Sequence, residues 1–432
     1  MGIECQTLPD SLQWVYDIDD QRRATVVTGR SFKDRYGSLG GATEHQPVVL
    51  APVVDWPLPV GARLVETADG PCVVHDRLFS GPGVSSAWAA MSDCAAAFGD
   101  HYPMPSDLVF LDTETTGLSG GTGTHVFLVG VGRFIGEVFH VRQFFMRHPG
   151  DERAVLSALQ DDLSDAAAIV SYNGRTFDIP LLHTRFMMHG RRFSAPERHF
   201  DLLSSSRAIW KHRLPSCSLS AIELEVLGVE RSVDAPGWMI PQLYFDYLRS
   251  RHVQMLEPVF EHNRQDILSL ARLAAVVHGF ESGLTIPDHA VDRLAVAILR
   301  LRRSGSAQAI EDVRQLWPVL TVPSELRLRG LRDISVALKR QRRHAEAAED
   351  WTRALADPSR AIRLFATEEL AKHYEHRERD HLRALEMARR GADAAILIAD
   401  ELSSAAFNRR VQRLELKLQL VHLESALSEE HA

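Results

Sequence analysis

A buried strand that ends in two carboxylates is the feature that most constrains this chain. The apolar run at residues 108–111 leads directly into Asp112 and Glu114, and the turn-forming letters "TTGLSGG" follow. Side chains along a strand alternate between its two faces, so Asp112 and Glu114 point to the same side. Two carboxylates so close repel each other. Such a pair is tolerated only on a solvated face or around a positive charge.

Composition places the chain among ordinary globular proteins. Its 432 residues are 45% hydrophobic and 25% charged, and that length predicts two or three domains. The formal net charge of −8 gives no general attraction to nucleic acid, so any basic groove has to be local. The four cysteines are scattered without a Cys-x-x-Cys pair, which predicts reduced thiols rather than a disulfide or zinc framework.

The chain shows no pattern that predicts contact with a membrane. Its first letters, "MGIECQTLPD", lack the basic and apolar regions of a signal peptide. No apolar run approaches the roughly 18 residues that a bilayer-spanning helix needs. We therefore expect a cytoplasmic protein without a membrane partner.

Residues 1–104 are interpreted as an N-terminal segment that is partly β. Proline and glycine interrupt its short apolar runs, and the stretch "VGARLVETADGPCVVHDRLF" alternates on both sides of Asp69-Gly70. Alternation on both sides of Asp-Gly is a strong hairpin signal. We predict a hairpin there and assign no function to the segment.

Residues 105–280 alternate between strand and helix patterns. Strands are predicted at "LVFLD", "HVFLVGVGRF", "VFHVRQFF", "AAIVSY" and "RHFDLL", and helices at "ERAVLSALQDDL", "DIPLLHTRFMMH" and "VFEHNRQDILSLARLAAVVH". Three meandering strands followed by alternating helices and strands is the order of a ribonuclease H-like fold. We therefore predict an α/β domain with a mixed five-stranded sheet and flanking helices.

Residues 285–432 are predicted to be wholly helical, because they are rich in Ala, Leu, Arg and Glu. Ala347, Trp351, Ala354 and Pro358 are placed much as in a tetratricopeptide repeat, and a second copy begins about 34 residues after Ala337. The register of that copy then slips by about three residues, so the repeat is degenerate. A helical bundle without repeats is the alternative.

Two further carboxylates follow the predicted sheet. Asp178 comes after the strand at 168–172, where a helix begins, and Asp266 lies on the long helix that ends the domain. In a ribonuclease H-like sheet the first strand is central, and both helices cross near its end. Asp112, Glu114, Asp178 and Asp266 are therefore expected to converge.

Four converging carboxylates predict a site for divalent cations. They cannot all ionise without positive charge between them, because like charges raise each other's pKa. Mg²⁺ and Mn²⁺ prefer hard oxygen ligands of this kind. Two such ions about 4 Å apart form the clamp used to cleave phosphodiester bonds. We therefore expect two Mg²⁺ or Mn²⁺ ions as cofactors.

Three motifs, in this order, resemble those of the DEDD superfamily of 3′–5′ exonucleases. They are Asp112-x-Glu114, Asn173-x-x-x-Phe177-Asp178 and His262-x-x-x-Asp266. The whole stretch from "FLDTETTGLSGG" to "HNRQDILSLARL" resembles the YprB-type ribonuclease H-like domain of bacterial proteins, which often carries a tetratricopeptide-like C-terminal region. The resemblance is loose in the helical region and nearly absent from the N-terminal segment.

The resemblance implies a role for each carboxylate. Asp112 would bridge the two metal ions. Glu114 and Asp266 would hold the ion on the side of the attacking water, and Asp178 would hold the other ion, partly through water. All four are thereby expected to be metal ligands and catalytic residues.

The resemblance also implies which residues bind substrate. The turn of Thr115, Thr116 and Gly117 would lie against the terminal nucleotide, and Gly117 would let the backbone approach it closely. Asn173 would form a hydrogen bond near the scissile end. Phe177 belongs to the same motif and is expected to contact substrate there.

His262 departs from the pattern of the superfamily. The histidine branch places its base five residues before the last Asp, and the tyrosine branch places an aromatic residue four before it. His262 stands four residues before Asp266. Residues four apart share a helix face, so His262 still reaches the site. It is expected to be the catalytic base for the attacking water, or else to orient Asp266.

The implied function is a metal-dependent 3′–5′ exonuclease acting on single-stranded or frayed nucleic acid, with helical repeats that recruit substrate or a protein partner. The alternative is a weak or inactive nuclease-like scaffold that binds nucleic acid or a protein. The intact carboxylates favour the enzyme, because an inactive site has little reason to keep four mutually repelling acids. No motif separates DNA from RNA, since that choice rests on contacts to the 2′-hydroxyl.

Overall fold

The chain folds into two compact units. The computed structural model describes residues 56–98, 103–117, 122–231, 235–396 and 401–429. The first unit, here called the sheet unit, ends at Ile286. The second, the helical unit, starts at Pro287 and also takes in the short segment Ala208–Arg213.

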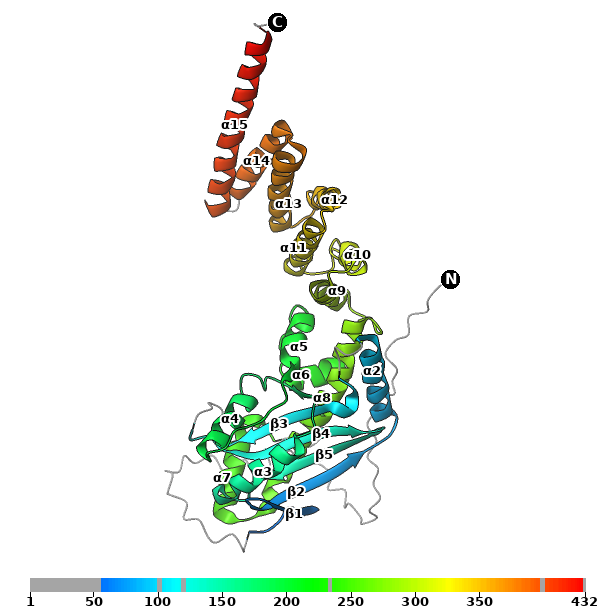
Figure 1. Ribbon diagram of the computed structural model, residues 1–432, viewed down its shortest axis with the longest axis vertical. Coiled ribbons are helices and arrows are strands. Elements are labelled where there is room, and N and C mark those ends of the chain that lie inside the picture. Colours follow the sequence, from blue (N-terminus) through cyan, green and yellow to red (C-terminus); the bar gives the residue numbers. More distant parts are fainter. Residues whose placement is uncertain (1–55, 99–102, 118–121, 232–234, 397–400, 430–432) are drawn as a thin grey trace. The chain divides into compact units, whose positions relative to one another are not determined.

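A mixed sheet forms the centre of the sheet unit. Its strands are β1 (Ala62–Thr67), β2 (Gly70–Phe79), β3 (Leu108–Thr115), β4 (Val126–Ile135), β5 (Val138–Phe145), β6 (Ala168–Ser171) and β7 (Arg198–Asp201). They lie in the order β1-β2-β5-β4-β3-β6-β7. Figure 1 labels β1 to β5. Strands β3, β6 and β7 run parallel, and the other neighbours pair antiparallel. The mixed α/β sheet expected from the sequence is confirmed.

The sheet has seven strands rather than the predicted five. The two additional strands are β1 and β2, which form the predicted hairpin and meet at Thr67 and Gly70. Strand β2 then pairs with β5, from Val73 opposite Phe145 to Phe79 opposite Phe139. The predicted number of strands was wrong. The sequence signal of a hairpin is local and does not show which distant strand the hairpin will pair with.

Strand β3 is buried on both faces. Its residues 108–111 are fully buried, which explains why they form an unbroken apolar run rather than an alternating one. The helices around the sheet are α2 (Pro82–Phe98), α3 (Glu152–Asp162), α4 (Asp178–Met188), α5 (Leu202–Trp210), α6 (Leu219–Ile222), α7 (Ile240–Ser250) and α8 (Glu257–Ser282). Shorter turns are the 3₁₀ segments Pro105–Asp107, Pro149–Asp151, Gly237–Met239 and Val253–Leu256 and the π-helix Glu223–Leu227.

Helix α8 packs directly on β4 and β3. Pro258 lies in its first turn, where backbone N–H groups have no acceptor within the helix, so the missing N–H of proline costs no hydrogen bond. The helix is followed by Gly283, which has a left-handed φ of 82°. Gly132 of β4 permits the close packing, because a Cβ there would lie 2.5 Å from the Ile267 side chain. The helix that carries His262 and Asp266 is therefore held against the central strands.

The helical unit contains α9 (Ala290–Ser304), α10 (Ala307–Leu316), α11 (Ser324–Arg340), α12 (His344–Ala354), α13 (Arg360–His373), the π-helix Tyr374–Glu378, α14 (His381–Ile396) and α15 (Glu401–Glu429). Consecutive helices contact each other. Trp351, singled out by the repeat pattern, is buried, and its Nε1 donates to Ser335 Oγ at 2.8 Å. The all-helical prediction is confirmed, and the tetratricopeptide register stays a prediction. Among the described helices, none is long and apolar enough to cross a membrane.

Candidate active site

Asp112 and Glu114 lie near the carboxyl end of strand β3. They occupy alternate positions, and the Glu114 side chain is 11% exposed. Directly opposite Asp112, on β4, stands Gly130. Gly130 offers no side chain to fill the space beside Asp112, which is left to a residue of α8.

Asn263 of α8 fills that space and fixes Asp112. Its Nδ2 donates to Asp112 Oδ2 at 2.9 Å, and a Cβ at Gly130 would lie 2.3 Å from its Oδ1. Gln143 Nε2 donates to Asn263 Oδ1 at 2.9 Å and to the Phe260 carbonyl at 2.8 Å. These bonds turn the NH₂ group of Asn263 toward Asp112. Asn263 was not predicted, because an amide next to His262 in the sequence carries no spacing signal of its own.

Asp178 is the first residue of helix α4 and is 5% exposed. Thr113, which lies between the two acids of β3, donates a short hydrogen bond from Oγ1 to Asp178 Oδ1. Gly174 keeps room for the carboxylate, since a Cβ there would lie 3.1 Å from Asp178 Oδ2. Burial raises the pKa of Asp178 to about 6 despite the hydrogen bond from Thr113.

Asp266 and His262 reach the same place from helix α8. His262 Nε2 lies 3.7 Å from Asp266 Oδ2 and 4.0 Å from Glu114 Oε1. The two residues are one helical turn apart, so they share the face that α8 turns toward β3. The structure thus brings all five predicted catalytic residues into one cluster.

The side chains of Asp112, Glu114, Asp178 and Asp266 are here called the acidic cluster. Burial and mutual repulsion dominate its electrostatics. Burial raises the pKa of Asp112 well above its ordinary value, and the charges of Asp266 and Asp178 raise it further. The pKa of Glu114 is raised by burial and by the neighbouring charge of Asp112. Asp112, Glu114 and Asp178 can all carry charge only when positive charge is brought to them.

Arg231, which no motif indicated, brings positive charge to the cluster. Its Nε and Nη2 bind both oxygens of the buried Glu223, at 2.7 Å and 2.8 Å. Nη2 also forms a short hydrogen bond with Asp266 Oδ1, and Nη1 donates to His262 Nδ1 at 3.1 Å. The guanidinium lowers the pKa of Asp112 and partly offsets the repulsion. Arg231 lies 35 residues before Asp266 in an irregular segment, so only the fold unites them.

The contact with Arg231 fixes which nitrogen of His262 carries the proton. A guanidinium can only donate, so His262 Nδ1 must accept. The proton of a neutral imidazole is then on Nε2, the atom that faces Glu114 and Asp266. In this arrangement Nε2 is a donor, and His262 can accept a proton there only after the contact with Arg231 changes.

Comparison with known proteins agrees with this geometry. Residues 109–278, which include all four carboxylates, match the family model described as the RNase_H superfamily. Over 318 residues the sequence is 33% identical to the uncharacterized protein YprB of Bacillus subtilis (strain 168), covering 72% of this chain and 75% of that protein. The chain belongs to the YprB family. Its ribonuclease H-like domain is therefore a domain of nuclease type.

One solved structure similar to this YprB-family chain is the family B DNA polymerase from the hyperthermophilic archaeon Pyrobaculum calidifontis. The two are 18% identical with a TM-score of 0.35, and the match covers 50% of this chain and 29% of the polymerase.

In this YprB-family domain, the turn predicted to bind substrate is held by hydrogen bonds of its own threonine side chains. Thr115 Oγ1 donates to the Gly117 carbonyl at 2.7 Å, and Thr116 Oγ1 accepts from the backbone N–H of His125 at 2.9 Å. Around Gly117 the nearest atom to an added Cβ would be Thr124 Oγ1, at an ordinary 3.6 Å. Gly117 is therefore not required by any close approach within the described protein.

Asn173 and Phe177 flank the turn that leads into Asp178. Asn173 adopts a left-handed backbone with a φ of 67°, and its Oδ1 accepts from Thr176 Oγ1 at 2.8 Å. Its side chain is exposed, whereas Phe177 is half-buried. The side-chain oxygen of Asn173 is thus engaged in holding the turn.

The donor chemistry of the acidic cluster suits hard divalent cations, because carboxylate oxygens are the ligands that Mg²⁺ and Mn²⁺ prefer. As the described side chains stand, however, no group of three or more His, Cys, Asp or Glu is arranged to hold a metal ion. Oxygens of three carboxylates are engaged instead by the Asn263 amide, the Thr113 hydroxyl and the Arg231 guanidinium. Metal ligation therefore requires some of these hydrogen bonds to be exchanged.

Proposed function

We propose that this YprB-family chain is a metal-dependent 3′–5′ exonuclease that acts on single-stranded or frayed nucleic acid. The observation that carries the proposal is the gathering of four carboxylates near the end of β3, where burial and neighbouring charges raise the pKa of Asp112 and Glu114. Such an arrangement is unfavourable for a protein that binds no cation, since each acid destabilises the charged form of its neighbours.

Asp112, Glu114, Asp178 and Asp266 would hold two Mg²⁺ or Mn²⁺ ions. When bound, such ions lower the pKa of water and neutralise charge on the phosphate. The protein's own groups would prepare the ligands. Asn263 holds Asp112 and Thr113 holds Asp178, so two of the carboxylates are oriented before any cation arrives. Such second contacts commonly tune metal affinity.

The proposal that cleavage starts at a 3′ end rests on the DEDD-type motifs. The turn from Thr115 to Gly117 directly follows Glu114, is held by hydrogen bonds and would receive the terminal nucleotide. Asn173 and Phe177 would contact the strand from the other side of Asp178.

The test is cleavage of end-labelled single-stranded DNA and RNA with Mg²⁺ or Mn²⁺. Wild type should shorten the linear strands from the 3′ end, and Asp112→Asn should lose cleavage. Asp107→Asn is a matched control, because Asp107 is exposed just before β3 and outside the cluster. A circular strand should resist wild type. Rapid nicking of the circle would replace the exonuclease proposal with an endonuclease.

The second candidate is an inactive nuclease-like scaffold, and the contact between Arg231 and Asp266 favours it. A guanidinium that permanently replaced the cation would leave no metal site. Calorimetric titration with Mn²⁺ separates the two functions. An exonuclease should bind Mn²⁺ in wild type, and Arg231→Gln should bind it at least as tightly because a competing cation is gone. No heat of binding in either protein would support the scaffold.

A further inference from the structure

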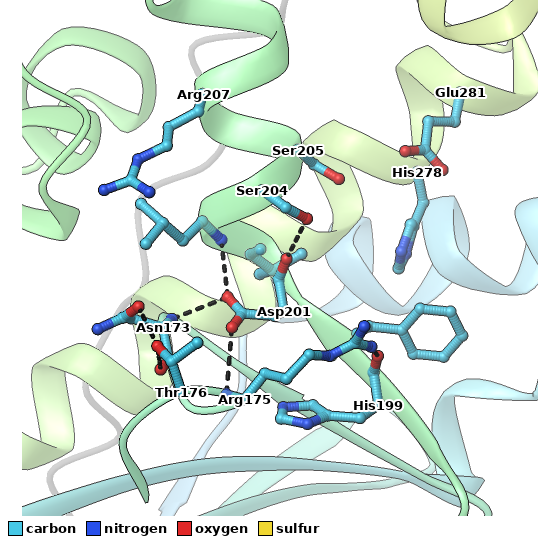
Figure 2. Close-up of a pocket in the computed structure, with 13 residues that line it drawn as sticks. Asn173, Arg175, Thr176, His199, Asp201, Ser204, Ser205, Arg207, His278 and Glu281 are labelled. Atoms are coloured by element: carbon cyan, nitrogen blue, oxygen red, sulfur yellow. Dashed lines mark hydrogen bonds between the residues drawn. The ribbon is translucent and has the colours of Figure 1, made fainter. Parts of the chain in front are cut away.

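Asp201 is the last residue of strand β7, and no sequence motif assigned it a role. It lies in the wall of a pocket of about 340 Å³ where β6 and β7 end (Figure 2). The two strands pair in parallel, with Asp201 opposite Ser171, the last residue of β6. The chain leaves β6 at that point and turns into helix α4. Asp201 therefore stands beside the turn that leads to Asp178.

The carboxylate of Asp201 binds this turn through backbone N–H groups. Its Oδ1 accepts from the N–H of Asn173 at 2.8 Å, and its Oδ2 accepts from that of Arg175 at 3.1 Å, as Figure 2 shows. Oδ1 also accepts from the N–H of Leu203 at 3.1 Å, at the start of α5. Hydrogen bonds to an ionised carboxylate are stronger than those between neutral groups. One side chain thus joins the end of β7 to the turn before α4 and to α5.

The turn needs such a partner because Asn173 has a left-handed backbone. Its φ is 67°, in a region that is uncommon for residues other than glycine. Backbone of this kind persists where the surrounding contacts fix it. The side chain of Asn173 makes one such contact, since its Oδ1 accepts from Thr176 Oγ1 at 2.8 Å. The bond from the Asn173 N–H to Asp201 makes the other.

The path of the turn decides where the carboxylate of Asp178 lies. Gly174 passes so close to the end of β6 that an added Cβ would lie 2.4 Å from Ser171 Oγ and 3.1 Å from Asp178 Oδ2. Arg175 Nη2 donates to the His199 carbonyl at 2.5 Å, which is a second bond from the turn to β7. A turn released from β7 would therefore displace Asp178, the first residue of α4.

We infer that Asp201 is a positioning residue, which holds Asp178 and Asn173 in the places from which they would bind metal and the nucleic acid strand. The inference rests on the proposed nuclease function, because Asp178 is a metal ligand only under that function. The three bonds of the Asp201 carboxylate go to backbone groups outside the acidic cluster. Asp201 thus acts through the turn and not as a ligand itself.

Calorimetric titration with Mn²⁺ tests the inference without cleavage. Asp201→Ala should weaken Mn²⁺ binding by about tenfold, which is usual when a group that orients a metal ligand is lost. Asp201→Asn should lose less affinity. Its side-chain oxygen still accepts from Asn173 and Leu203, whereas its NH₂ group cannot accept from Arg175.

Ser218→Ala is the matched control. Ser218 Oγ caps helix α6 by accepting from the N–H of Ala221 at 3.2 Å, just as Asp201 accepts from the first turn of α5. Loss of this cap should lower the melting temperature and leave Mn²⁺ affinity unchanged, because the turn before α4 stays intact. Circular dichroism melting shows that each variant is folded.

A double-mutant cycle with Asp178→Asn shows whether Asp201 acts through Asp178. The effect of Asp201→Ala on Mn²⁺ affinity should vanish in the Asp178→Asn background. If Asp201→Ala did not fold, the cycle is run with Asp201→Asn. Equal losses in both backgrounds would overturn the inference. So would equal losses for Asp201→Ala and Asp201→Asn, because removal of charge alone would then explain the effect.

The same measurements separate this inference from the proposed function. Wild type that cleaves strands, together with Asp201→Ala that binds Mn²⁺ as tightly as wild type, would overturn the inference and leave the exonuclease standing. Wild type that binds Mn²⁺ with the expected dependence on Asp201 but cleaves no strand would refute the exonuclease and leave the positioning role standing.

Discussion

Arg231 contacts Glu223, Asp266 and His262 at once, and its contact with His262 decides how that histidine can act. It pairs with the buried Glu223, reaches Asp266 and donates to His262 Nδ1 at 3.1 Å. A base at His262 Nε2 therefore needs Arg231 to move away. Substrate phosphate is a natural competitor for a guanidinium. Arg231 thus both offsets negative charge in the acidic cluster and controls whether His262 can accept a proton.

His262→Ala should lower kcat by about 10²–10⁴-fold, because a positioned base is lost. Binding of Mn²⁺ should persist, since the four carboxylates remain. His262→Tyr should recover part of the rate if the position, rather than the imidazole, is what matters. The measurements are single-turnover cleavage at saturating metal and calorimetry of Mn²⁺.

A double-mutant cycle with Arg231→Gln adds the control. If His262 acts only by holding Arg231, the effect of His262→Ala should vanish in the Arg231→Gln background. Wild-type cleavage by His262→Ala, with chemistry limiting, would show that the residue has no catalytic part.

Two glycines in β4 allow helix α8 to pack closely on the sheet and so shape the candidate active site. Helix α8 can place Asn263 against Asp112 only because Gly130 and Gly132 carry no side chain. The first seven residues of β4 are buried, and the two glycines among them are the positions at which the helix approaches the sheet. The geometry of the acidic cluster thus depends on how closely two elements pack.

Gly130→Ala should destabilise the fold by roughly 1–3 kcal/mol, because overpacking forces the Asn263 side chain to move. Cleavage and Mn²⁺ affinity should both fall, since Asp112 loses its oriented partner. Gly237→Ala is the matched control, because an added Cβ there would meet nothing within 4 Å. Urea unfolding and calorimetry provide the readouts. Unchanged metal affinity in a destabilised Gly130→Ala would mean that Asn263 does not prepare Asp112.

Helices α3 and α4 are joined by a buried ion pair whose contribution depends on pH. Arg185 Nε and Nη2 bind the two oxygens of Glu152, each at 2.5 Å. Despite burial, the hydrogen bonds from His125, Arg185 and His189 lower the pKa of Glu152 from 4.5 to about 2. A lowered pKa in the folded state stabilises the protein above pH 4.5, and the contribution is lost as pH falls toward 2.

Glu152→Gln should therefore flatten the pH dependence of the free energy of unfolding between about pH 2 and 4.5, a window set by the two pKa values. Wild type should lose at most roughly 3 kcal/mol over the full titration. Glu197→Gln, an exposed change, should leave the slope as in wild type. Parallel curves for wild type and Glu152→Gln would contradict the assignment.

At the scale of the molecule, the four predicted catalytic carboxylates lie in the sheet unit, and the helical unit has a core of its own. Trp351 and Trp317 are fully buried in that core. The predicted helical repeat, if these helices form it, would present an extended surface for binding. We expect the helical unit to serve recruitment of a partner or substrate rather than the chemistry.

Trp351→Ala should destabilise the helical unit by about 3–5 kcal/mol, because a large buried side chain is removed. Cleavage of short oligonucleotides should stay at the wild-type rate below the new transition temperature. Calorimetric melting and single-turnover cleavage are the two measurements. Leu320→Ala is the control, since Leu320 is 65% exposed in the same unit. Loss of cleavage in step with unfolding of the helical unit would tie that unit to the chemistry.

Much about this protein could be determined from the sequence by itself. The apolar run before Asp112, the alternation around Asp69-Gly70 and the helical period around Asp266 each follow from side-chain geometry within a few residues. The order of the acidic motifs also indicates the family. These features are local, so they are readable without knowing what packs against them.

Tertiary structure alone decided the pairing of β2 with β5, the approach of Asn263 to Asp112 and the placement of Arg231 between Glu223 and Asp266. Each joins residues that are distant in the chain, and neither amide nor guanidinium has a spacing that marks its partner. The physical reason is that a buried polar or charged group needs a partner that is close to it in the folded state. Proximity of that kind is created when sheet and helices pack, and no short stretch of sequence contains it.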